Sequence, residues 1–287
     1  MLVPILGVLF DGFAYGMLLF LLSVGLSVTL GMMNFVNLAH CSFAMLGGYV
    51  TVTLTQRFGW PFLAALPAAF LAAVMASVVL ERTLYRRLYR GSALDQCLLT
   101  IGVVFISVAV AAYVYGTVQQ PIHTPPYLRG SVTFMGVTFG VYRLFLIGVG
   151  LLITGILVAA LEYTRFGVQV RAAVDNQRMA RGLGIDVDGA FAVTFALGSG
   201  LAGLGGALAI EMVGLDPAFA FTYLVYVLIV VSVGGLGSIG GSLAAALLLG
   251  VSDVAGKYYV PELGAFLIYL VMVALLMWRP AGLLGRR

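Results

Sequence analysis

The chain has 287 residues, of which 62% are hydrophobic and only 9% are charged, and its formal net charge is +4. Soluble domains average about 25% charged residues, so this composition excludes an ordinary soluble protein and places the chain in a lipid bilayer. Its apolar runs are long and continuous, whereas strands of a membrane barrel alternate over about ten residues. The sequence therefore predicts an all-α polytopic membrane protein.

Nine hydrophobic segments can be drawn along the chain, and we expect some of them to be broken or re-entrant. The first is too long for the core of a signal peptide and is expected to remain as a membrane helix. In chain order the nine segments are 4–31, 34–55, 61–81, 95–117, 141–163, 187–213, 219–235, 240–257 and 262–279.

Basic residues are divided unevenly among the connections between these segments. Eleven arginines fall in alternate connections, at 82–90, 165–181 and 279–287. The other connections hold Arg57, Arg129, Arg143 and Lys257. By the positive-inside rule the first group is cytoplasmic, so nine crossings place the N-terminus outside and the C-terminus in the cytoplasm. Orientation also explains the basic pI without a nucleic-acid partner.

Two asparagines and a histidine interrupt the first apolar stretch, from Asn34 to His40. Irregular backbone at membrane depth is tolerated only where protein or a water-filled cavity surrounds it, and broken segments in both halves of a chain indicate a transport path. We therefore expect a broken or re-entrant element here. Its candidate substrate-path residues are Asn34, Asn37, His40, Cys41 and Ser42. A polar packing role is the alternative for His40.

Few acidic residues lie within the apolar segments. Asp95 stands at a helix start, where the helix dipole favours a negative charge, so a structural role is expected. Asp11 and Asp253 are expected near the outer surface or facing other protein groups. Glu211 follows a small-residue face suited to tight helix packing, and it is a candidate substrate contact at the external end of the path. An ordinary helix-end role is its alternative.

Two further connections are informative. The stretch 118–140 is the longest external loop, and either a contact with an external partner or simple solvation would account for it. The glycine-rich stretch 233–242 interrupts the second half of the chain. It fits either a tight loop at the cytoplasmic surface or a second broken segment along the path.

The most polar stretch, Arg165–Asp188, lies between two apolar segments. It predicts a short cytoplasmic helix at about 168–184, stopped by Gly182 and Gly184, that a cytoplasmic partner grips. The chain contains no GxxxxGK[ST] nucleotide-binding motif, so energy from a nucleotide must come from another subunit. Two distant histidines and two cysteines without metal spacing predict no catalytic cluster, no metal site and no cofactor.

Several motifs, in order along nearly the whole chain, resemble the branched-chain amino acid ABC transporter permeases of the LivH type. They are the run 25–49, Glu81-Arg82 with Tyr85-Arg86, the segment 165–188, the glycines of 234–241, and Arg279–Gly285. The chain departs from the family pattern at Asn37, Cys41, Arg87 and Gly240. The first two fall in the predicted path, so the resemblance indicates the family without naming the solute, which could be a branched-chain amino acid or a related small polar molecule.

The resemblance implies that residues 1–287 form one permease domain, a non-catalytic subunit of an importer in the bacterial inner membrane. It implies two ABC ATPase subunits, a second related permease and a periplasmic substrate-binding protein as partners. The cytoplasmic helix would then couple ATPase motion to transport through Arg165, Arg171, Asp175, Asn176, Arg178 and Gly184. The competing interpretation is a secondary transporter or channel, which would need a coupling-ion site that the sequence does not show.

Overall fold

The computed structural model describes residues 2–33, 35, 37–88, 91–120, 125–134 and 136–285, and most of them are helical. Within these ranges six helices are long and apolar enough to cross a membrane. Two shorter apolar helices, Phe219–Gly234 and Phe266–Trp278, accompany them. The expected class of helical, multi-pass membrane protein is confirmed, whereas the nine crossings and their orientation stay predictions.

The first half of the chain is built from helices α1 to α5. Their bounds are α1 Leu2–Met33, α2 His40–Val52, the π turn η1 Thr53–Arg57, α3 Phe62–Leu80, the π turn η2 Glu81–Tyr85, α4 Arg86–Leu88 and α5 Ala93–Tyr115. A capping box starts α5: the Ser92 hydroxyl accepts a hydrogen bond from Asp95 N at 3.2 Å, and the Asp95 carboxylate accepts one from Ser92 N at 3.1 Å. The structural role predicted for Asp95 is confirmed.

The connection predicted as a loop at 118–140 contains regular structure that was not expected from the sequence. A 3₁₀ turn, η3 (Pro126–Leu128), precedes an antiparallel hairpin of β1 (Ser131–Phe134) and β2 (Val137–Gly140), in which Phe134 pairs with Val137. The prediction of purely α structure is corrected by this small sheet. Valine, threonine and phenylalanine favour strands, and Gly136 supplies the positive φ of 77° that a tight hairpin turn requires.

The second half of the chain carries the remaining helices. Their bounds are α6 Val141–Tyr163, α7 Arg165–Asp175, α8 Gln177–Gly182, α9 Val187–Val213, α10 Phe219–Gly234, α11 Ile239–Tyr259 and α12 Gly264–Trp278. Because α10 and α11 are joined by only four residues, the glycine stretch is a tight turn and not a broken membrane segment. Gly235 and Gly237 adopt positive φ there, and Gly31 at the end of α1 packs on Gly237.

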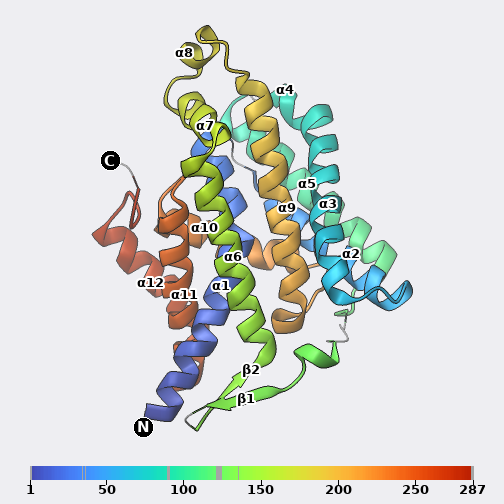
Figure 1. Ribbon diagram of the computed structural model, residues 1–287, viewed down its shortest axis with the longest axis vertical. Helices are drawn as coiled ribbons and strands as arrows, with labels where there is room; N and C mark the ends of the chain where they lie inside the picture. The colour runs from blue at the N-terminus through green and yellow to red at the C-terminus, as the bar shows by residue number, and fades with distance from the viewer. Residues whose placement is uncertain are drawn as a thin grey trace.

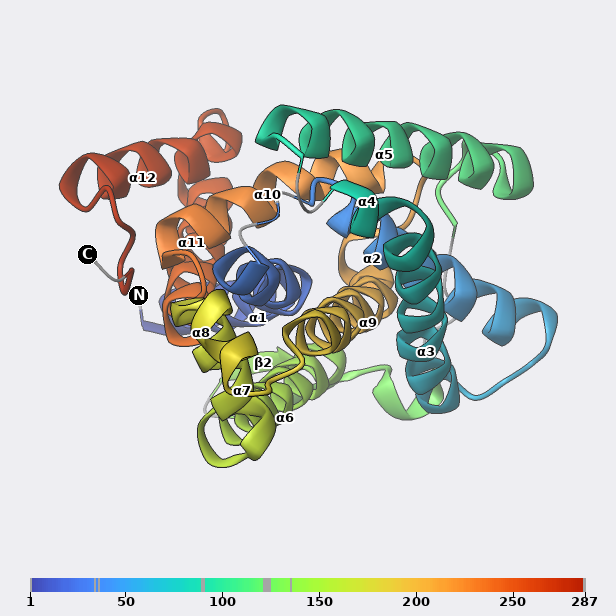
Figure 2. The ribbon, with the colours of Figure 1, turned by 90° about the horizontal axis from the view of Figure 1, so that it is seen from above.

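Helices α1 and α9 lie side by side in the middle of the bundle, with the other helices around them (Figure 2). Small residues allow this close approach, as is common between membrane helices. A Cβ atom added to Gly25 of α1 would lie 2.1 Å from the Gly198 carbonyl oxygen of α9, and one added to Gly206 would lie 1.8 Å from the Ala44 carbonyl oxygen of α2. The core therefore depends on backbone contacts that no larger side chain permits.

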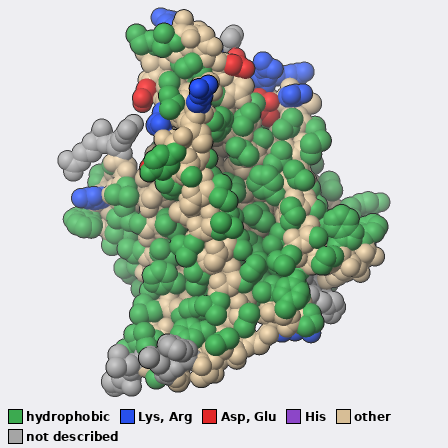
Figure 3. Space-filling model, viewed as in Figure 1, with side chains coloured by type: hydrophobic (Ala, Val, Ile, Leu, Met, Phe, Trp, Pro, Cys, Tyr) green, Lys and Arg blue, Asp and Glu red, His purple; other side chains and the backbone are tan. Residues whose placement is uncertain are grey.

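The molecule has two distinct ends and an apolar flank. Helices α4, α7 and α8 lie at one end, and the N-terminus with the β hairpin lies at the other (Figure 1). Charged side chains gather around the α7–α8 end, and hydrophobic side chains cover most of the flank in this view (Figure 3). Large apolar residues such as Phe105, Ile106 and Leu152 are exposed on α5 and α6. This distribution matches a bundle whose sides face lipid or another membrane helix.

Candidate functional site

The chain turns back into the bundle directly after α1. His40, the first residue of α2, donates from Nε2 to the Leu22 carbonyl oxygen at 3.1 Å. Leu22 precedes Met33, the last residue of α1, by eleven positions, which is about 16 Å along the helix. His40 therefore lies back at the level of Leu22, and α2 starts deep inside the bundle. This is the geometry expected of a re-entrant element at the predicted interruption.

Four of the five path residues predicted in this element lie within the described ranges, and Asn34 lies outside them. Asn37, His40, Cys41 and Ser42 are all buried. The Asn37 side-chain oxygen accepts a hydrogen bond from Ala39 N at 3.1 Å, and its backbone oxygen accepts one from His40 N at 3.3 Å. The asparagine that departs from the family pattern thus shapes the turn that starts α2.

Several buried polar atoms, in the re-entrant element and beyond it, have no hydrogen-bond partner among the described residues. They include Nδ2 of Asn37, the Ser42 hydroxyl, the Tyr85 hydroxyl and the Ser199 hydroxyl. Leaving a buried donor or acceptor unsatisfied costs about 1–3 kcal/mol, so such atoms usually serve a purpose or bind water. The atoms come from the re-entrant element, from η2 and from α9. They give an otherwise apolar core several unused hydrogen-bonding positions.

An aromatic cluster that was not expected from the sequence packs against the re-entrant element. Phe35 lies 5.5 Å from Tyr85, and Tyr85 lies 5.4 Å from Phe195 of α9, measured between ring centroids. Phe43 of α2 also contacts Phe195, at 6.0 Å. The available signal was Tyr85 itself, an aromatic residue in a short arginine-rich stretch between two apolar segments. The cluster joins the re-entrant element to η2 and α9.

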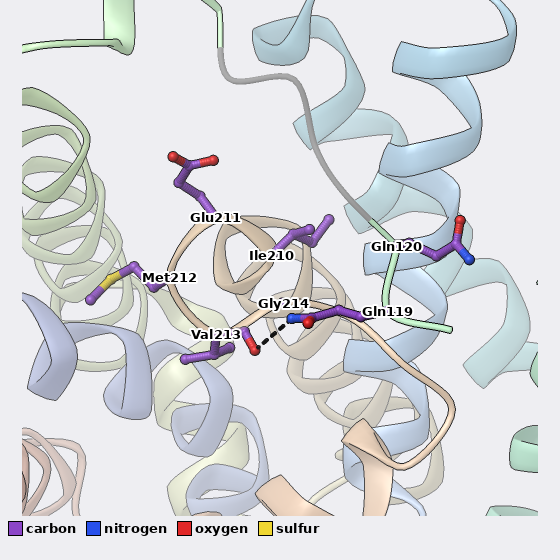
Figure 4. A pocket seen from close by; sticks show the side chains of 7 residues that line it. All are labelled: Gln119, Gln120, Ile210, Glu211, Met212, Val213 and Gly214. Carbon is purple, nitrogen blue, oxygen red and sulfur yellow. Dashed lines mark hydrogen bonds between the residues drawn. The ribbon is translucent and has the colours of Figure 1, made fainter. Parts of the chain in front are cut away.

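Glu211 lies at the opposite end of α9, beside a separate cavity of about 430 Å³. Gln119 and Gln120 also line this cavity, and Gln119 Nε2 donates to the Val213 carbonyl oxygen at 3.5 Å. The Glu211 side chain points away from both glutamines (Figure 4). Gly205 of α9 packs on Leu21 and Leu22 and so marks the level of His40. Glu211 lies six residues farther along α9, which is about 9 Å. The structure therefore does not bring Glu211 beside the re-entrant element.

The segment predicted as one cytoplasmic helix at 168–184 is two helices, which we call the α7–α8 hairpin (165–182). Thr164 caps α7, and Asn176 ends it with an extended backbone. The Asn176 side-chain oxygen then accepts a hydrogen bond from Met179 N at 3.0 Å and so starts α8. An asparagine side chain competes with backbone hydrogen bonding in this way, which explains the break. Gly184 follows α8 with a φ of 81°.

The predicted coupling residues are all exposed on this hairpin, and several also hold its shape. Arg171 donates to the Leu161 carbonyl oxygen and ties α7 to the end of α6. Arg165, Asp175 and Arg178 are exposed, and Asp175 also interacts with another residue. Val170 packs with Ala190 of α9, and Val28 of α1 packs against this pair.

Two large apolar side chains on the hairpin were not singled out from the sequence. Met179 is 68% exposed and Leu183, directly after α8, is 78% exposed. Both lie near Arg178, and nothing within the described residues covers them. Isolated exposed apolar side chains are ordinary on a protein surface, but two together on a charged projection form a surface suited to a partner.

Comparison with known proteins places the whole arrangement in one family. Residues 8–276 match the family described as branched-chain amino acid transport system / permease component. The chain belongs to this family. The matched range includes all the described site residues above, so the permease carries them inside its family domain.

Named relatives align with the permease over most of their own length. The probable branched-chain amino acid transport permease protein LivH of Methanocaldococcus jannaschii is 28% identical over 291 residues, which cover 94% of this chain and 90% of that protein. The high-affinity branched-chain amino acid transport system permease protein BraD of Pseudomonas aeruginosa is 29% identical, with 97% and 95% covered. The corresponding LivH protein of Escherichia coli K12 is 26% identical, with 97% and 94% covered. No solved structure matches the chain.

Proposed function

We propose that the permease is the membrane subunit of an ABC importer for branched-chain amino acids or a related small polar solute. Its family and its named relatives support a transport role for such amino acids. In this proposal the protein lies in the bacterial inner membrane and works with two ABC ATPase subunits. A second related permease and a periplasmic substrate-binding protein complete the importer, and the permease itself performs no chemistry.

The α7–α8 hairpin is the observation that best supports an ATPase partner. It projects from the end of the bundle, carries exposed arginines, and presents Met179 and Leu183 uncovered. Since the chain has no phosphate-binding loop, ATP can drive this permease only through another subunit. Burying a leucine or methionine side chain at a contact contributes about 1.5–3 kcal/mol, so these two residues could anchor such a subunit.

The hairpin is packed so that its movement would reach the re-entrant element. Val28, near the end of α1, packs against the pair formed by Val170 of α7 and Ala190 of α9, and α1 leads directly into the stretch that carries Asn37. The same helix α7 contacts Ala190 at the start of α9. A nucleotide-dependent movement of the ATPases would thus act on both central helices. This continuous packing supports coupling between the ATPases and the re-entrant element. The two transport states would then differ in their affinities for nucleotide and for solute.

The proposed solute path follows the re-entrant element. Its polar groups come from Asn34, Asn37, His40, Cys41 and Ser42, and Glu211 belongs to its external end. The unpartnered atoms of Asn37 and Ser42 support this assignment, because a passing solute or water could satisfy them. His40 already donates to Leu22, which supports a positioning role for its ring within the same path.

Reconstitution tests the proposed function. The permease would be coexpressed with ABC ATPase subunits and a second permease, purified through a tag on this chain, and placed in liposomes with the binding protein. We expect the ATPases to copurify and L-leucine uptake to require both ATP and the binding protein. Leucine uptake by this chain alone, without ATP, would contradict the proposal and favour a secondary transporter or channel.

A further inference from the structure

A second cavity lies at the end of the bundle opposite the α7–α8 hairpin, and it contains two ion pairs. Its volume is about 350 Å³. It is lined by four charged residues, and we call it the ionic cavity. These residues are Asp11 of α1, Arg143 of α6, and Asp253 and Lys257 of α11. Arg143 lies in the first turn of α6, and Asp253 and Lys257 lie in the last turns of α11, so these groups are at one end of the bundle. Met212 and Val213 line both this cavity and the one beside Glu211, so the two adjoin.

The four charged groups differ in depth. The side chain of Asp253 is only 2% exposed, whereas those of Lys257, Arg143 and Asp11 are 53%, 41% and 34% exposed. Asp253 is thus the floor of the cavity, and the other three groups surround its mouth. Arg143 pairs with Asp11, and Lys257 Nζ donates to Asp253 Oδ2 at 2.6 Å. The ammonium group of Lys257 also lies 5.7 Å from the centre of the Tyr15 ring.

The floor of the cavity holds an unused acceptor. Asp253 Oδ1 is buried and has no hydrogen-bond partner, although Oδ2 of the same carboxylate is paired. A buried carboxylate oxygen without a donor is costly in a membrane protein, where charged groups mark functional sites. Asp253 lines the cavity, so a ligand that supplies a charged donor to its carboxylate would remove this cost.

The mouth of the cavity holds unused donors. An ammonium group has three N–H donors and a guanidinium group has five. The structure shows one hydrogen bond from Lys257, to Asp253, and one from Arg143, to Asp11. Both cations therefore keep N–H groups that can bind an acceptor without breaking their ion pairs. A ligand that fits this cavity would therefore supply hydrogen-bond acceptors at the mouth and a hydrogen-bond donor at the floor.

We propose that the ionic cavity binds a zwitterionic α-amino acid, with its ammonium group on the Asp253 carboxylate and its carboxylate on Lys257 and Arg143. This inference rests on the proposed import function and names the class of solute. Two acidic and two basic groups leave no net charge in the cavity, which matches a molecule with one charge of each sign. The apolar side chain of the solute would pack on Met212, Val254 and the Tyr15 ring, which also line the cavity.

The sequence did not reveal this site because its residues are far apart along the chain. Arg143 and Asp11 are separated by 132 positions. The expectation that Asp11 and Asp253 lie near the outer surface or face protein groups agrees with their places, but it did not join them. A purely structural role, in which the two ion pairs fasten the ends of α1, α6 and α11, is the outcome that the test must distinguish.

Equilibrium binding of L-leucine to the complete complex in nanodiscs, without the periplasmic protein, tests the inference. Asp253→Asn keeps the shape of the side chain and removes its charge, and it should weaken leucine binding about 10- to 100-fold, because a hydrogen bond to a charged group is lost. Lys257→Gln should weaken it to a similar degree. Arg143→Gln is a third variant at the exposed mouth, where a folding defect is least expected. Glu262→Gln is the matched control, since this carboxylate is exposed at the same end of the bundle and outside the cavity.

Two leucine analogues test the contributions of the ammonium group and the carboxylate one at a time. Isopentylamine keeps only the ammonium group and 4-methylpentanoate keeps only the carboxylate, so both should compete at least about 10-fold more weakly than leucine. Weakened binding in the cavity variants with normal binding in Glu262→Gln would support the site. Wild-type affinity in all three cavity variants, or no leucine binding by the wild-type complex, would overturn it.

The thermal unfolding midpoint of each complex separates binding from structure. Variants that unfold earlier yet bind leucine with wild-type affinity would assign the ion pairs a purely structural role and would also overturn the inference. Failure of the import proposal looks different, because it appears as ATP-independent uptake whether or not leucine binds this cavity.

Discussion

At the scale of single residues, the candidate path is defined by polar atoms that the fold buries and leaves unpaired. Asn37 and His40 are partly explained by the turn that starts α2, because both make hydrogen bonds there. Ser42 is different, since its buried hydroxyl has no partner. A residue that only packs would be better as alanine at this position, because the hydroxyl costs desolvation without forming a bond. Ser42 therefore separates a packing role from a transport role.

We predict that Ser42→Ala leaves the thermal unfolding midpoint of the complex unchanged or raises it, while the initial rate of leucine uptake falls about 2- to 10-fold. The loss corresponds to one neutral hydrogen bond of about 0.5–1.5 kcal/mol. Ser199→Ala is the control, since its hydroxyl is also buried and unpaired but lies on α9, outside the proposed path. Unchanged uptake in Ser42→Ala would assign this serine to packing alone.

At the scale of elements, the hydrophobic segments and the interruption at 34–40 were predictable, whereas the break within 168–184 and the depth to which the chain returns were not. Each predicted apolar segment contains a helix, because continuous apolar residues at membrane depth must satisfy their backbone internally. The break at Asn176 depends on one side chain competing with the backbone, and hydrophobic periodicity carries no trace of it. The return of the chain from Met33 to the level of Leu22 likewise depends on a contact across eighteen residues, between His40 and Leu22. Local patterns cannot report such contacts.

The hairpin structure changes which residues should contact a partner. Arg171, Asn176 and Gly184 hold the shape of the hairpin through a carbonyl contact, a helix cap and a positive φ. Changes at these positions would alter the hairpin itself. Met179 and Leu183, in contrast, contribute exposed apolar surface and little to the fold. They offer a cleaner test of docking than the residues chosen from charge alone.

We predict that the double variant Met179→Ser, Leu183→Ser weakens the affinity for the ATPase subunits about 10-fold or more, because two apolar side chains would lose their burial in the partner. The unfolding midpoint of the isolated permease should not change, since both side chains are exposed. Leu263→Ser makes the same kind of change at an exposed leucine at the opposite end and should retain normal affinity. Equal ATPase binding by the double variant, measured by titration in detergent, would remove the hairpin from the interface.

At the scale of the whole molecule, the two polar ends have different chemistry. The α7–α8 end carries outward-facing arginines with exposed apolar residues, which suits a protein partner. The opposite end carries the ionic cavity and the cavity beside Glu211, which suit a small solute. The positive-inside rule assigns the arginine-rich end to the cytoplasm. The cavities would then open toward the side from which an importer receives its solute. The protein contact at the α7–α8 end and the solute sites at the opposite end therefore require the same orientation of the chain in the membrane.

Cysteine labelling checks that orientation. In a Cys97→Ala background, where Cys41 is buried, single cysteines would be placed by Leu183→Cys beside α8 and by Glu262→Cys between α11 and α12. Both native side chains are exposed, so a membrane-impermeant maleimide can reach either one from its own side. In spheroplasts we expect Glu262→Cys to react and Leu183→Cys to stay unlabelled, and in inverted vesicles we expect the reverse. The opposite pattern would place the hairpin outside the cell, where no ATP-driven partner could use it, and would turn the ionic cavity toward the cytoplasm.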